Sequence, residues 1–283
     1  MKDIIKLCVY EFRIQMTSKR VWLGYLVGIV IVLNQALGFV RYGAFIGEPV
    51  NVLEAFIIVG NCDRTIMFLA VGWLLIMSEA PFVDRISFYA LYRTKRSRWN
   101  RAMLLYIVCQ AVIYYAVIAI VVMAVSGVNG YFANIWSVPF MRVLEPMSGA
   151  GDFNVDFPSA DFADVESVFT GFAHTFALQV LYAVLLGILV YVVSQVTSRM
   201  AGPVAAFILH FLGYEIMKEG YGFTITYSLL ARSIPAFQVG NSALEDLFQS
   251  YLIFAVFILV LVGISGRAVR YMDFKNMAIQ EGD

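Results

Sequence analysis

The sequence predicts an all-α integral membrane protein with six spanning helices and both termini in the cytoplasm. Apolar residues make up 61% of the 283-residue chain and charged residues only 14%, and the mean hydropathy is +0.78. This composition excludes an ordinary soluble domain. Cationic and acidic connections alternate between the apolar runs, and this alternation predicts the number and direction of the spans.

The first 20 residues are predicted to form an amphipathic helix in the cytoplasmic headgroup layer. On a helical wheel the apolar arc holds Ile4, Ile5, Cys8, Val9, Phe12 and Met16, and the opposite arc holds Lys2, Lys6 and Arg13. The segment has no continuous apolar core and no small-residue cleavage site, so we do not expect a removable signal peptide.

Six apolar runs are expected to cross the membrane, because about 20 helical residues span the hydrocarbon core. Their ranges are 21–40, 65–79, 102–125, 172–196, 203–217 and 251–266. The second run is short, which predicts tilt or a locally thinned bilayer. In the first run, Gly24 and Gly28 form a small-xxx-small pair that lets another helix approach closely, with dimerisation as one option.

The connections differ in charge and length. The segment 41–64 has too few apolar residues to span and is expected to form an outer interfacial or re-entrant helix. The segment 126–171 is acidic and aromatic and is expected to be a partly ordered outer loop. Only five of the 20 Lys and Arg residues fall in segments expected outside, namely Arg41, Arg64, Arg142, Lys218 and Arg232. This bias supports six spans with both ends inside.

The loop 80–101 is the longest cationic segment and is expected in the cytoplasm. Pro81 ends the preceding helix near Glu79, and Asp84 can cap a short helix that runs to Leu91. The groups that follow suit the phosphate layer of the inner leaflet. These expected interface anchors are Arg93, Lys95, Arg96, Arg98, Trp99 and Arg101.

Two stretches of this loop carry a family resemblance. Glu79-Ala80-Pro81-Phe82 with Asp84, followed by Tyr92-Arg93-Thr94-Lys95-Arg96-Ser97-Arg98-Trp99, resembles the first cytoplasmic loop of permease subunits in ABC-2-type transporters. In that family the loop carries a coupling helix that docks on a separate ATPase subunit. The resemblance implies that the docking residues here are Asp84, Arg85, Ser87, Phe88, Leu91 and Tyr92.

The same resemblance implies the wider organisation of the complex. It implies a single transmembrane domain over residues 1–283, with an outer re-entrant region at 218–250 before the last span. It also implies cytosolic ATPase subunits that bind the ATP and Mg, and a second permease copy or paralogue. Cofactors are therefore not expected in this chain itself.

The sequence offers no set of residues that would make this chain an enzyme. It has no Walker loop, and neither His174 nor His210 lies in a His-Glu-x-x-His pattern, so we expect neither catalytic residues nor a metal site. Asp152 to Asp156 mimics the start of a calcium loop, but Phe157 replaces the required glycine and Ala163 the bidentate glutamate.

Three ionisable groups are candidate buried polar residues, since such groups are expensive at membrane depth. His210 and Glu215 lie in the fifth run, where His210 is expected to be bonded inside the bundle and Glu215 to reach the headgroups. Glu79 lies at the inner end of the second run and is expected to pair with Arg85 or with a basic group of the N-terminal helix.

The sequence thus favours a permease subunit of an ATP-driven exporter in the plasma (inner) membrane, embedded in the lipid bilayer and without a nucleic-acid partner. The alternative is a non-transporting scaffold, sensor or assembly protein whose basic loop binds anionic lipid. The substrate is not identified by the sequence, although spans with few fixed charges suit amphiphiles better than ions.

Overall fold

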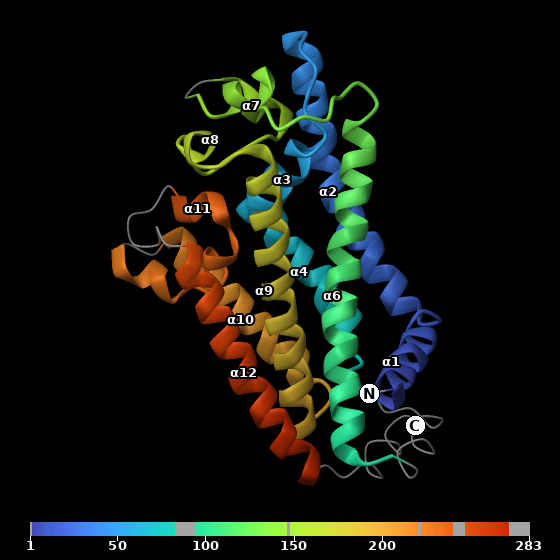
Figure 1. The fold of residues 1–283 in the computed structure, drawn as a ribbon. Coiled ribbons are helices and arrows are strands. Elements are labelled where there is room, and N and C mark those ends of the chain that lie inside the picture. Colours follow the sequence, from blue (N-terminus) through green and yellow to red (C-terminus); the bar gives the residue numbers. More distant parts are fainter. Residues whose placement is uncertain (1, 83–93, 146–147, 220–221, 240–246, 272–283) are drawn as a thin grey trace.

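The structure is a computed structural model that describes residues 2–82, 94–145, 148–219, 222–239 and 247–271. Within these residues the chain is all-helical, which confirms the all-α part of the predicted fold class, and the bridged pair Asn51 and Tyr131 belongs to no strand. Figure 1 shows long helices running together, with the short helices α7 and α8 at one end of the bundle and α1 near the other.

Four described helices are long and apolar enough to cross a membrane: α2 (Lys19–Ile46), α6 (Arg96–Ser126), α9 (Val168–Val196) and α12 (Leu247–Tyr271). A fifth crossing results if α3 (Glu54–Asn61) and α4 (Asp63–Met77), which meet at a bend of 83°, form one broken span. The protein is therefore an α-helical membrane protein. Six spans and cytoplasmic termini stay predictions.

The remaining described elements are shorter or lie at the ends of the bundle. They are α1 (Lys2–Gln15), α7 (Val138–Val143), η1 (Ala150–Phe153), α8 (Phe162–Val165), α10 (Ala201–Glu219), η2 (Gly222–Tyr227), η3 (Ala231–Ser233) and α11 (Pro235–Val239). α10 covers the expected fifth run, but its composition does not place it among the four apolar spans.

The amphipathic helix α1 packs against α6. Cys8 is buried, and the ring of Phe12 lies 5.0 Å from that of Tyr106 on α6. Ile5 and Val9, from the same apolar arc, are about half exposed. The arc is therefore divided between the protein and the surroundings of the helix, as suits an element at an interface.

Small residues let α2 and α4 cross closely. A Cβ atom on Gly24 would lie 2.6 Å from the carbonyl oxygen of Gly72, and one on Gly72 would lie 2.8 Å from the carbonyl oxygen of Gly24. A Cβ atom on Gly28 would lie 2.5 Å from the Tyr114 hydroxyl. The small-residue pair seen in the sequence thus serves packing within this chain.

The segment between α6 and α9, residues 127–167, is held by an aromatic cluster. Trp136 stacks on Phe140 at 4.3 Å between ring centroids, and Phe157 and Phe162 meet these rings edge-on. Ser137 caps α7 by accepting a hydrogen bond from the Phe140 amide. This packing agrees with the order expected from the aromatic content. We refer to residues 127–167 as the α6–α9 segment.

Candidate functional site: a cleft beside the broken helix

The first half of the broken helix is anchored to the α6–α9 segment by a buried carboxylate. All eight residues of α3 are buried, and Glu54 at its start is 0% exposed. The Glu54 carboxylate accepts hydrogen bonds from the Ser137 amide at 2.6 Å, from the Ser137 hydroxyl, and from the Asn51 amide at 3.2 Å. These bonds partly offset the desolvation of the buried carboxyl group.

The far end of α3 is anchored to α9 and α11 by two buried amides. Asn61 donates to the Thr175 hydroxyl at 3.0 Å and accepts from the Ala236 amide at 2.8 Å. Gln179 donates to the carbonyl oxygens of Gly60 at 3.1 Å and of Ser233 at 3.2 Å. Polar side chains therefore hold both ends of α3, and the bend at Cys62 is fixed by the helices around it.

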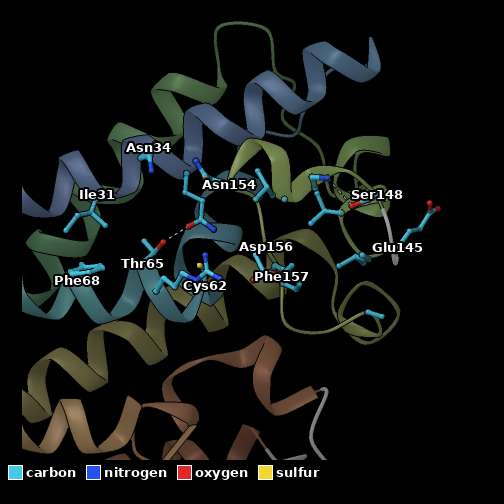
Figure 2. A pocket seen from close by; sticks show the side chains of 18 of the residues that line it. Ile31, Asn34, Cys62, Thr65, Phe68, Glu145, Ser148, Asn154, Asp156 and Phe157 are labelled. Atoms are coloured by element: carbon cyan, nitrogen blue, oxygen red, sulfur yellow. Dashed lines mark hydrogen bonds between the residues drawn. The ribbon is translucent and has the colours of Figure 1, made fainter. Parts of the chain in front are cut away.

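The bend opens onto a cleft of about 1100 Å³ between α2, α4 and the α6–α9 segment. Figure 2 shows Ile31 and Phe68 toward one end of the cleft, Thr65 and Cys62 in the middle, and Glu145 at the other end. The described lining residues are Val30, Ile31, Asn34, Gln35, Cys62, Arg64, Thr65, Phe68, Val143, Leu144, Glu145, Ser148, Ala150, Gly151, Asn154, Val155, Asp156, Phe157 and Ala160. This mixture of apolar walls and a few polar groups is typical of a ligand site.

One polar group of the cleft lacks a partner. Gln35 is 4% exposed, and its Oε1 accepts a 2.6 Å hydrogen bond from the Thr65 hydroxyl. Its Nε2 has no hydrogen-bond partner among the residues that the structure describes. A buried amide donor without an acceptor costs free energy, so an acceptor that reached this nitrogen would bind there favourably.

A second pocket, of about 180 Å³, adjoins the cleft and shares Cys62 and Asp156 with it. On its rim Lys218 of α10 lies 4.0 Å from Asp63 at the start of α4, and both side chains are partly exposed. Within the described part of the chain, no cluster of three or more His, Cys, Asp or Glu side chains is placed to hold a metal ion.

The expected docking residues lie outside the described residues. This holds for Asp84, Arg85, Ser87, Phe88, Leu91 and Tyr92, and also for the expected anchor Arg93. Among the other expected anchors, Lys95, Arg96, Arg98 and Arg101 are exposed at the start of α6. Trp99 is not an interface anchor, because it is only 3% exposed and packs against Tyr191 of α9. Met103 and Tyr106, which lie on the same face of α6 as Trp99, are also buried.

The three candidate buried polar residues behave differently. His210 is fully buried, and its ring nitrogens lie 2.7 Å from the Tyr182 hydroxyl and 3.2 Å from the Met67 carbonyl oxygen. Glu79 is partly exposed and pairs with Arg20 at 3.3 Å. Glu215 is exposed rather than buried, because five residues of helix place it about 140° around α10 from His210.

The sequence did not single out Gln35, which lines the cleft, or the three residues that anchor α3 beside it, namely Glu54, Asn61 and Gln179. Gln35 and Gln179 are buried polar residues inside expected spans, and Glu54 and Asn61 are buried polar residues of the segment 41–64. That position is a usable signal, since a polar group at membrane depth needs an internal partner. The partners themselves, such as Ser137 for Glu54, come from distant parts of the chain and are visible only in the fold.

The chain matches no known family model, and neither the curated proteins nor the solved structures contain one with significant similarity to it.

Proposed function

We propose that the chain is the permease subunit of an ATP-driven, ABC-type exporter in the plasma (inner) membrane. In this proposal separate cytosolic ATPase subunits bind ATP and Mg, and a second permease copy or paralogue completes the path. The observation that carries the proposal is the cleft of about 1100 Å³, which is lined by two apolar helices and has room for a cargo molecule.

The contacts around the cationic loop support a coupling role. Residues 83–93 join α4 to α6, and the start of α6 is tied to two other helices. Arg98 pairs with Asp3 of α1 at 3.2 Å, and Arg96 donates to the carbonyl oxygen of Arg270 on α12 at 2.6 Å. A push on the loop would thus reach α1, α4, α6 and α12 together. α4 and α2 form two walls of the cleft.

The test is charge reversal at two of the docking positions. The double variant Asp84→Arg with Arg85→Asp is purified in mild detergent from native membranes, beside the wild-type chain. We expect a protein with Walker motifs to co-purify with the wild-type chain, together with ATP hydrolysis, and both to be lost in the variant while membrane insertion is unchanged.

A matched control applies the same reversal to the α6–α9 segment. Arg142 and Asp164 are both exposed, so Arg142→Asp with Asp164→Arg should leave the ATPase bound. If no Walker-motif protein accompanies the wild-type chain, or if the loop variant retains it, the proposal is wrong. Scrambling residues 84–92 at constant composition then tests the scaffold alternative, because attraction to anionic lipid survives scrambling.

A further inference from the structure

The polarity of the cleft changes in steps along both helices that line it. On α2, Val30 and Ile31 are followed one turn later by Asn34 and Gln35. The contacts of Gly24 with Gly72 and of Gln35 with Thr65 show that α2 and α4 run antiparallel. Along α4 the same direction therefore leads from Phe68 to Thr65 and Arg64. Both walls change from apolar to polar toward the α6–α9 segment.

The apolar end of the cleft is open at its side. Val30 is 59% exposed and Phe68 is 55% exposed, although both line the cleft. Both belong to helices with the composition of membrane spans, α2 and the broken pair α3 and α4. Large apolar side chains exposed there face hydrocarbon, so an acyl chain can enter the cleft from the bilayer.

The middle of the cleft offers hydrogen-bond donors. The unpaired Nε2 of Gln35 lies in the wall, and Arg64 stands one turn from Phe68 on the same face of α4. Arg64 is the only cation among the described lining residues. An amide donor and a guanidinium together suit an anionic, acceptor-rich group such as a phosphodiester.

The end formed by the α6–α9 segment is acidic. Asp156 and Glu145 line it, and both carboxylates are exposed. Figure 2 places Asp156 beyond Thr65 and Cys62, with Glu145 farther along. Carboxylates in this position suit an ammonium group that follows the phosphate.

We propose that the cleft binds a zwitterionic, phospholipid-like amphiphile, with its acyl chain over Val30 and Phe68, its phosphate at Gln35 and Arg64, and its ammonium group toward Asp156. Naming this lipid as the cargo rests on the proposed function, whereas its binding requires no ATPase. The two ideas can therefore fail separately.

The experiment measures lipid binding by the full chain in delipidated detergent micelles. The probe is phosphatidylethanolamine with a fluorescent acyl chain, followed by anisotropy. Phosphatidylglycerol and diacylglycerol with the same chain serve as comparison lipids. We expect phosphatidylethanolamine to bind most tightly, and Gln35→Leu to weaken its binding about tenfold through loss of a hydrogen bond to a charged group.

Three further variants locate the effect. Gln110→Leu is the matched control, because Gln110 is equally buried, donates one bond to the Tyr25 hydroxyl, and lies outside the cleft. It should bind the probe like the wild-type chain. Arg64→Gln alters an exposed side chain, so it tests the phosphate contact even if Gln35→Leu does not fold. Asp156→Asn with Glu145→Gln should abolish the preference for phosphatidylethanolamine over phosphatidylglycerol.

Several results would overturn the proposal. These are equal binding of all three lipids by the wild-type chain, unchanged affinity in both Gln35→Leu and Arg64→Gln, or an equal loss in Gln110→Leu. Effective competition by soluble phosphoethanolamine would likewise show that the head group binds without the bilayer lipid. Loss of ATPase co-purification alone would leave the binding result standing.

Discussion

α9 and α12 have the same mean hydropathy over their most apolar stretches, yet they occupy opposite environments. Of an apolar stretch of 18 residues in each helix, 67% is buried inside the protein in α9, against 11% in α12. Figure 1 shows α9 among the other helices and α12 along the side of the bundle. Hydropathy therefore identifies a helix that can span a membrane but does not say whether protein or lipid surrounds it.

The difference lies in the polar side chains. α9 carries Thr175, Gln179, Tyr182 and Tyr191, each hydrogen-bonded to another part of the chain. In α12 such contacts are fewer and lie mainly near its start: Ser250 bonds Gln238, Tyr251 bonds His174, and Ser265 bonds Asn100 of α6. Because polar groups cannot face hydrocarbon without cost, their density along a span marks the helix that the others surround.

The largest expected effect comes from Leu186→Ala in α9. Leu186 is 1% exposed, so its truncation leaves a cavity and should lower the free energy of unfolding by about 3 kcal/mol. Unfolding in mixed detergent micelles, followed by circular dichroism, measures the change. A loss near zero would mean that α9 is not the packed centre of the bundle.

The second-largest loss in the free energy of unfolding is expected for Gln179→Leu. Its amide bonds the carbonyl oxygens of Gly60 and Ser233 and accepts from the Tyr115 hydroxyl at 3.2 Å. At about 0.6 kcal/mol for each bond within a membrane, the three lost bonds amount to about 2 kcal/mol. The same unfolding assay applies, and a stabilised variant would contradict this assignment of partners.

Ser265→Ala should have a smaller effect. The Ser265 hydroxyl accepts from Asn100 Nδ2 at 3.0 Å and is fully buried, so its loss is expected to cost about 0.6 kcal/mol. Proteolysis in micelles offers a second measurement, because a loosened α12 should be cleaved faster. Equal losses in Ser265→Ala and Gln179→Leu would remove the contrast between the two helices.

The smallest effect is expected for Leu259→Ala, the matched partner of Leu186→Ala. Leu259 is 69% exposed, so the change should stay within about 0.5 kcal/mol in micelles of the single chain. A loss as large as that of Leu186→Ala would show that another molecule covers this face of α12. Size-exclusion chromatography with light scattering would then reveal whether a second copy is the cover.

The sequence was sufficient for much of the fold but for little of the site. Each expected run overlaps a helix, and the described residues of the acidic, aromatic loop pack around an aromatic cluster. Trp99 shows where prediction from the local sequence fails. Its position beside cations predicted an interface anchor, but helical periodicity turns it toward Tyr191. The cleft could not be predicted, since Gln35, Thr65 and Asp156 come from three separate segments.

Composition and periodicity by themselves determined an all-helical membrane protein with a cationic loop between its second and third apolar runs, because burial in lipid forces the backbone to satisfy its own hydrogen bonds. Only the tertiary structure decided which helix is central, where α3 and α4 bend, and which polar groups meet. Those outcomes depend on contacts between residues far apart in the chain, such as Glu54 with Ser137, which no local pattern records.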